Sequence, residues 1–169
     1  MNYILKISGK VVPKGRPRFS EGKVFTPIET KNYEQHVVEC WIKSKLEKLP
    51  DDIPLAICVV AYSKTPKSRE IEALSFDGKF CKTKPDADNL MKSIMDGLNE
   101  FAYSDDSRIV AAQCIKKYGT EDCAYVFIGT MVDENDKMEY IRYINNALMY
   151  NKNKEVINYA EEEDNSEND

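Results

Sequence analysis

The stretch Pro54–Tyr62, Pro-Leu-Ala-Ile-Cys-Val-Val-Ala-Tyr, is an almost uninterrupted run of apolar residues. A run of this length without alternation is typical of a strand that is buried on both faces. We therefore expect residues 54–62 to form a central strand of a sheet. The chain has 169 residues, of which 42% are hydrophobic and 31% are charged. These values fit one globular domain with a substantial core.

Patterns on either side of this run predict the other strands. Residues 3–9 alternate between apolar and polar side chains, and Val24 with Phe25 can form a second, short strand. Residues 109–118 and 124–132 alternate or run apolar around Gly-Thr-Glu-Asp at 119–122, which predicts a β-hairpin.

Helical spacing of apolar residues predicts the helices. Thr30 is a candidate N-cap for a helix that extends to about Lys48. A second helix is expected over residues 86–101 and a short one near 68–74. Met138, Ile141, Ile144 and Leu148 predict a last helix. The apolar stripe of the first helix would consist of Val37, Val38, Trp41, Ile42 and Leu46. The predicted fold class is mixed α/β, a small mixed β-sheet flanked by helices.

Charge is unevenly distributed along the chain. The net charge is −5, but eleven acids and four bases from Asp133 onward leave a net of +2 on the first 132 residues. Residues 1–32 hold seven bases and two acids. A basic leader and an acidic tail fit a protein that binds polyanions, although an ordinary solvated surface explains the pattern equally well.

The composition disfavours several chemistries and locations. The five cysteines are scattered without a Cys-x-x-Cys pair, so we expect reduced, mostly buried thiols and no metal or disulfide role. His36 is the only histidine, which argues against His-based catalysis. No apolar run approaches the roughly 20 residues that span a bilayer. The N-terminus begins with a strand pattern and not with a targeting peptide, so we expect a cytoplasmic protein with no membrane partner.

The segment Lys84–Asn99 carries the most chemistry. Its sequence is Lys-Pro-Asp-Ala-Asp-Asn-Leu-Met-Lys-Ser-Ile-Met-Asp-Gly-Leu-Asn. On a helix, one arc of this segment is apolar and faces the core: Leu90, Met91, Ile94 and Leu98. Asp88, Lys92 and Asp96 repeat at i, i+4 and i+8 and form a separate polar stripe.

Two carboxylates, Asp86 and Asp88, stand at the predicted start of this helix and repel each other unless a positive charge lies between them. The helix N-terminus supplies about half a charge, and a divalent cation supplies much more. Carboxylate oxygens suit Mg²⁺ or Mn²⁺, with water in the remaining octahedral positions. Lys92, one turn later, could steady an attacking hydroxide or the charge developing on a phosphate.

A structural explanation exists for the same residues. An Asp at an N-cap is common, and Asp88 with Lys92 is an ordinary i, i+4 pair. A second acidic turn, Tyr-Ser-Asp-Asp-Ser-Arg at 103–108, could fold a third carboxylate back toward the helix start, which favours a metal site. Turn chemistry also explains Asp-Asp-Ser. On the residues alone, both interpretations stay open.

These motifs resemble those of the RusA family of Holliday junction resolvases. Residues 84–99 follow the pattern Lys-Pro-Asp-x-Asp-Asn-Leu-x-Lys-x-x-x-Asp-x-Leu-Asn, and residues 103–109 follow Tyr-x-Asp-Asp-Ser-x-Ile. Val-Pro-Lys-Gly-Arg-Pro-Arg-Phe at 12–19 and Phe-Thr-Pro at 25–27 are similar to the leader of the family's phage and prophage members. The resemblance covers roughly residues 3–130.

The resemblance implies a RusA-like fold and a Mg²⁺-dependent endodeoxyribonuclease in which Mn²⁺ can replace Mg²⁺. As a homodimer, it would cut four-way DNA junctions in recombination and repair. Asp86, Asp88 and Asp106 would be the catalytic metal ligands, and Lys92 would support catalysis. Supporting roles are implied for three further residues that match the pattern: Asn89, Asp96 and Asp105.

Basic residues near the motifs are the predicted DNA contacts: Lys14, Arg16, Arg18, Lys23, Lys82 and Lys84. Phe19, Phe25 and Phe80 could stack on opened bases, but core packing is the expected role of each. We expect residues 1–132 to form the endonuclease domain and residues 133–150 a C-terminal helical extension. Residues 151–169 would be an acidic, disordered tail.

Two other functions fit parts of the pattern. One is a DNA- or protein-binding module without catalysis, in which the acids are helix caps and the basic loop binds. The other is a different Mg²⁺ enzyme, such as a phosphohydrolase acting on nucleotides. The chain has no Gly-x-x-x-x-Gly-Lys-Ser/Thr phosphate loop, which argues against nucleotide-triphosphate turnover by that route.

Overall fold

The computed structural model describes residues 1–20, 22–65 and 78–149. Within these residues the longer strands form a four-stranded sheet in the order β1-β6-β4-β5, and two short strands form a separate hairpin, β2-β3. The elements are β1 (Asn2–Ser8), β2 (Arg18–Ser20), β3 (Lys23–Phe25), α1 (Ile28–Lys43), β4 (Leu55–Lys64), α3 (Ala87–Leu98), the 3₁₀ turn η2 (Asp106–Arg108), β5 (Ile109–Gly119), β6 (Cys123–Thr130) and α4 (Glu134–Met149).

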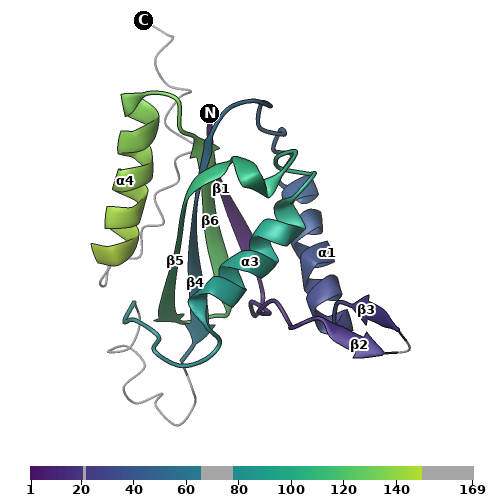
Figure 1. Cartoon of the computed structure of the whole chain (residues 1–169). Coiled ribbons are helices and arrows are strands. Elements are labelled where there is room, and N and C mark those ends of the chain that lie inside the picture. Colours follow the sequence, from purple (N-terminus) through teal and green to yellow (C-terminus); the bar gives the residue numbers. More distant parts are fainter. Residues whose placement is uncertain (21, 66–77, 150–169) are drawn as a thin grey trace, which may run out of the picture.

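The fold has three layers, with helices on both faces of the sheet. Figure 1 shows α1 and α3 on one face and α4 on the other. Strand β4 is antiparallel to β6 and parallel to β5, and β1 is antiparallel to β6, so the sheet is mixed. Strand β4 is interior, and its first seven residues are buried, as the apolar run predicts. The predicted mixed α/β fold with a small mixed sheet is confirmed.

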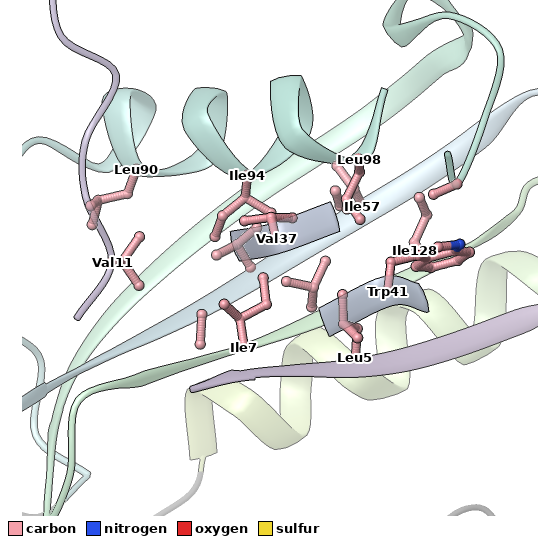
Figure 2. Packing of buried hydrophobic residues seen from close by; sticks show 14 of the residues in the cluster. Leu5, Ile7, Val11, Val37, Trp41, Ile57, Leu90, Ile94, Leu98 and Ile128 are labelled. Carbon is pink, nitrogen blue, oxygen red and sulfur yellow. The ribbon is translucent and has the colours of Figure 1, made fainter. Parts of the chain in front are cut away.

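Helix α3 is fixed in place by its apolar arc. Leu90, Ile94 and Leu98 are buried and belong to the same core cluster as residues of α1 and the sheet. Figure 2 shows these three side chains pointing from α3 into the core, Leu90 toward Val11, Ile94 toward Val37 of α1 and Leu98 toward Ile57 of β4. Each such burial is worth about 1.5–3 kcal/mol, so this face sets which way the polar stripe points.

Close packing of α3 on α1 depends on a glycine. A Cβ at Gly97 would lie 2.8 Å from Cβ of Val37 and 3.0 Å from the backbone oxygen of Glu34. Both separations are shorter than side chains tolerate, so only glycine allows the two helices to approach this closely. The position of α3, and of the residues at its start, is therefore defined by α1 as well as by the sheet.

The predicted hairpin between residues 109–118 and 124–132 is wrong, although both strands exist. Strand β4 lies between β5 and β6, and the three-residue connection crosses its end, where Lys64 pairs with Gly119 and Tyr62 with Cys123. The amide of Lys64 donates to Oδ1 of Asp122, which anchors this connection. Strand pairing is a tertiary property, and a tight turn does not by itself make two strands neighbours.

The predicted first helix begins and ends later than α1 does. The N-cap of α1 is Pro27, and Thr30 is instead a buried helical residue whose Oγ1 accepts a hydrogen bond from the amide of Gly15. The helix ends at Lys43 because Lys45 adopts a left-handed conformation, with a φ of 55°. Ile42, predicted in the apolar stripe, is 60% exposed.

The predicted last helix is present as α4, and of the four apolar residues that predicted it, Ile144 packs against the second core cluster. Met138, Ile141 and Leu148 are exposed. Tyr140 is buried instead, with its ring 5.9 Å from that of Phe127, and it completes a second core cluster on this face of the sheet. Aromatic residues cover more sheet surface than the aliphatic stripe would.

Other expectations have mixed outcomes. The five cysteines are free thiols, and Cys58, Cys81 and Cys123 are buried. No helix among the described residues is long and apolar enough to cross a membrane. The short helix predicted near 68–74 and the acidic tail over 151–169 lie outside the described residues.

Candidate metal and DNA-binding site

The start of α3 lies in a βαβ crossover. Strands β4 and β5 are parallel, and α3 connects them in sequence, so it starts on the side where both strands have their carboxyl ends. Nζ of Lys116, near the end of β5, donates to the backbone oxygens of Thr83 and Pro85 at 2.6 Å each. Helix N-termini at this edge of a sheet are common anion and ligand sites in α/β folds.

Asp86 and Asp88 are both exposed at this helix start. Asp86 is the N-cap residue of α3, but its side chain makes no capping hydrogen bond. Neither carboxylate has a hydrogen-bond or ion-pair partner among the described residues, and Asp88 does not pair with Lys92. The capping and i, i+4 roles that would explain these acids structurally are therefore not observed.

The third acid of the polar stripe, Asp96, has a structural role. Nζ of Lys14 forms an ion pair with Asp96 and a second one, at 2.6 Å, with Glu34 of α1. Burial lowers the pKa of Lys14, but hydrogen bonds to Asp96 and then Glu34 outweigh it, so the pKa is raised above 10.5. The backbone amide of Lys14 also donates to the backbone oxygen of Asn89 at 2.8 Å. Lys14 thus ties the N-terminal loop to both helices.

The second acidic turn lies at the other end of the crossover. Asp106 begins η2, directly before the start of β5 at Ile109. Lys116, which donates to the backbone oxygen of Pro85, follows Ile109 by seven residues in β5. At the usual rise of a strand, seven residues span roughly 23 Å. Burial raises the pKa of Tyr103, and the charges of Asp106 and Asp96 raise it further. Asp106 is therefore in electrostatic range of the same tyrosine as Asp96, on the far side of α3 from its start.

The side chain of Asp105 stabilises the turn in which it lies. Its Oδ1 accepts a hydrogen bond from the amide of Ser107 at 2.8 Å, and this bond lowers the pKa of the carboxyl. Within residues 1–20, 22–65 and 78–149, no three His, Cys, Asp or Glu side chains are grouped so that they could hold a metal ion. The described structure does not bring Asp106 to the start of α3, and its role as a third ligand stays a prediction.

The residues at the start of α3 fit a hard divalent cation. Asp86 and Asp88 offer exposed carboxylate oxygens with no competing partner among the described residues, on the positive end of a helix. Mg²⁺ is usually held by one or two carboxylates and keeps several waters, so two carboxylates are enough protein ligands for such an ion.

Lys116 is a site residue that the sequence patterns did not reveal. Burial raises the pKa of the Cys114 thiol to about 11, while Lys116 lowers it and Asp88 raises it, so both charges act on the same part of β5. Lys116 donates to two carbonyls in the segment before Asp86, those of Thr83 and Pro85. It lies in an ordinary strand pattern 30 residues from Asp86, and only the strand register could have indicated it.

The predicted DNA contacts divide into two groups. Arg16, Lys23, Lys82 and Lys84 are exposed and have no partner among the described residues. Lys14 is about four-fifths buried and holds two carboxylates, so its ammonium is not available as a phosphate contact in this arrangement. The side chain of Arg18 lies outside the described part of the structure. Lys82 and Lys84 directly precede the start of α3, and Arg16 follows Lys14, whose amide donates to Asn89 in the first turn of that helix; Lys23 lies on β3.

The part of the chain that contains most of the sheet, α1, α3 and this acidic helix start matches a family of nucleases. The sequence pattern described as endodeoxyribonuclease RusA matches residues 8–129, and the chain belongs to that family. It is also similar to the uncharacterized protein YqaN of Bacillus subtilis (strain 168), with 32% identity over 131 residues, or 72% of this chain and 92% of that protein. All of the site residues above lie inside the family match, and α4 lies beyond it.

Proposed function

We propose that this chain is a Mg²⁺-dependent endonuclease that resolves four-way DNA junctions by paired phosphodiester cuts. The family is one of endodeoxyribonucleases that act on branched DNA junctions. The observation that carries the finer proposal is the state of Asp86 and Asp88, which are exposed and without a partner among the described residues at the start of α3.

Asp86 and Asp88 would hold the metal ion, with Asp106 as a further ligand on the strength of the family resemblance. The ion, when bound, would supply a Lewis acid that lowers the pKa of a water molecule and offsets charge on the phosphate. Mn²⁺ would substitute because it accepts the same hard oxygen ligands.

The chain's own residues would bind and orient the phosphate. Lys92 is exposed one helical turn from Asp88, without a partner among the described residues, and it can donate to a non-bridging phosphate oxygen. Arg16, Lys82 and Lys84 flank the same helix start and can contact neighbouring phosphates. Each phosphate neutralised should steepen the log–log salt dependence of duplex binding by about 0.9.

A homodimer would place two such sites across a two-fold axis. Paired cuts on opposite strands of a junction require two active sites with matching geometry, which a symmetric dimer provides. The dimer is part of the proposal, as are the roles in recombination and repair and the origin in a phage or prophage.

The decisive experiment is cleavage of labelled four-way junction, linear duplex, single strand and free nucleotide, with Mg²⁺, Mn²⁺ or EDTA. We expect paired nicks in the junction with either metal and none with EDTA. Tight junction binding without a cut in either metal would favour the non-catalytic binding module. Hydrolysis of free nucleotide without junction cleavage would favour the general phosphohydrolase.

A further inference from the structure

The β2–β3 hairpin exposes apolar side chains in a way that the sequence did not predict. Phe19 is 74% exposed, Val24 is 69% exposed and Phe25 is 41% exposed. Phe80 is exposed as well, so the expectation that Phe19, Phe25 and Phe80 pack in the core is wrong. Figure 1 shows β2 and β3 beside α1, away from the four-stranded sheet. A three-residue strand pair that far from the sheet has no core in which to bury an aromatic ring.

The exposed side chains are arranged by the strand register. Phe19 pairs with Val24 across the hairpin, so the aromatic ring and the branched side chain lie on the same face. Burying a phenylalanine or valine side chain stabilises a protein by about 1.5–3 kcal/mol. Because Phe19 and Val24 are exposed, they do not contribute this stabilisation to the fold. An apolar pair retained on a short, projecting hairpin is typical of a contact surface.

The hairpin is tethered close to the start of α3. The amide of Lys14 donates to the backbone oxygen of Asn89, one residue from Asp88, and the amide of Gly15 donates to Oγ1 of Thr30. Phe19 follows Lys14 by five residues, so it lies within about 17 Å of that anchor even if the chain is fully extended. Each nucleotide of a B-DNA strand advances about 3.4 Å along the helix axis, so this reach corresponds to at most about five nucleotides measured along that axis.

The charges beside this face favour DNA as its occupant. Arg16 and Lys23 are exposed and have no partner among the described residues. Arg16 precedes Phe19 by three residues, and Lys23 precedes Val24 on β3, so Lys23 lies on the opposite face of the same hairpin. Cations that follow a backbone, combined with an aromatic ring, are the usual means of binding bases that are not stacked in a duplex. A second copy of this chain is the alternative occupant, and the oligomeric state without DNA distinguishes it.

We propose that the β2–β3 hairpin binds the branch point of the junction, where the ring of Phe19 stacks on a base that is unpaired or unstacked there. This inference rests on the proposed junction substrate. It assigns selectivity for branched over linear DNA to Phe19, and it assigns general phosphate affinity to Arg16 and Lys23. Apolar wedges of this kind insert at opened base steps in other DNA-binding proteins.

Equilibrium binding of the full chain to a four-way junction and to a linear duplex, in EDTA, tests the inference without cleavage. We expect Phe19→Ala to weaken junction binding by about 5- to 150-fold, the range expected for one base stacked on an aromatic ring. Duplex binding should change less than about two-fold, and Phe19→Tyr should restore selectivity. The matched control is Ile42→Ala, which removes an apolar side chain that is 60% exposed at the far end of α1.

The remaining outcomes overturn the inference. Equal losses on junction and duplex would assign Phe19 to general affinity, and unchanged junction binding would exclude it from the interface. A shift of oligomeric state in Phe19→Ala without DNA, measured by sedimentation velocity, would show that a second copy covers the face. These binding assays contain no divalent metal, so they do not depend on cleavage. A wild-type protein that does not cut the junction would contradict the proposed function but not the role of Phe19 in binding. A wild-type protein that cuts the junction, with no loss of selectivity in Phe19→Ala, would contradict only the role of Phe19.

Discussion

Two carboxylates on one stripe of α3, Asp88 and Asp96, have different surroundings. Asp88 is exposed at the helix start and has no partner among the described residues. Asp96, two turns later, is held by Lys14, which also binds Glu34. The same side chain at the same helical spacing is therefore available as a ligand at one end of the helix and structural at the other. The difference comes from the N-terminal loop, whose Lys14 amide binds the backbone of Asn89 while its side chain extends to Asp96 and away from Asp88.

The largest expected effect is on catalysis and comes from a change of Asp88, the exposed carboxylate at the start of α3. Asp88→Asn is nearly isosteric but removes the charge that would hold the metal, so we expect junction cleavage to fall by at least about 10²–10³-fold. The melting temperature should change by less than about 2 °C, because Asp88 is exposed and has no hydrogen-bond or ion-pair partner among the described residues. Single-turnover cleavage and thermal unfolding measure the two effects. A rate loss that parallels a lower melting temperature would refute the catalytic role.

An intermediate effect is expected from Lys116, which binds the backbone just before the start of α3. Lys116→Met removes both hydrogen bonds to the carbonyls before Asp86, and losing a residue that orients a metal ligand typically costs about 10–100-fold. Higher Mg²⁺ concentration should partly rescue the cleavage rate, because a misplaced ligand weakens metal affinity. Lys116→Arg is the conservative control and should retain most of the rate. A rate loss that no Mg²⁺ concentration changes would contradict this positioning role.

The smallest effect on the reaction is expected from Asp96, the carboxylate that is paired with Lys14. Asp96→Asn removes one ion-pair partner of Lys14, and we expect a loss of about 1–2 kcal/mol in the free energy of unfolding. For a chain of this size the melting temperature would fall by about 2–8 °C, with cleavage within about three-fold of wild type at low temperature. The ion pair raises the pKa of Lys14, so its stabilisation is present below pH 10.5 and is lost as pH rises through the raised value. Unfolding at pH 7 and above pH 11 would show it, and a larger effect of Asp96→Asn at the higher pH would contradict it.

The strands and helices were largely predictable because each has a local periodicity. The apolar run at 54–62 became β4, and the arc of Leu90, Ile94 and Leu98 became the buried face of α3. The placement of β4 between β5 and β6 was not predictable, because a register is decided by which strands meet in the folded sheet. The end of α1 was missed for a local reason, a left-handed Lys45, which is uncommon for a residue other than glycine.

The site was predictable in part. Its carboxylates followed from the motif at 84–99. The helical spacing alone did not distinguish Asp88 from Asp96, which share one stripe, and only the family resemblance gave them different roles. In the structure the difference depends on Lys14, 74 residues before Asp88 in the chain. Lys14 was predicted to contact DNA because it lies in a basic loop, and only the folded structure shows that its charge is already neutralised. Exposure of Phe19 was missed because aromatic residues are usually at least partly buried, and no sequence pattern indicated that Phe19 lies on a hairpin, β2–β3, apart from the main sheet.

The most direct test of this account is Mn²⁺ binding to the DNA-free protein, measured by titration calorimetry and electron paramagnetic resonance. We expect the wild type and Asp96→Asn to bind Mn²⁺ with affinities within about three-fold of each other, since Asp96 is structural. Asp88→Asn should weaken binding by at least about ten-fold. Equal Mn²⁺ binding by Asp88→Asn and the wild type, or a loss confined to Asp96→Asn, would contradict a metal site at the start of α3.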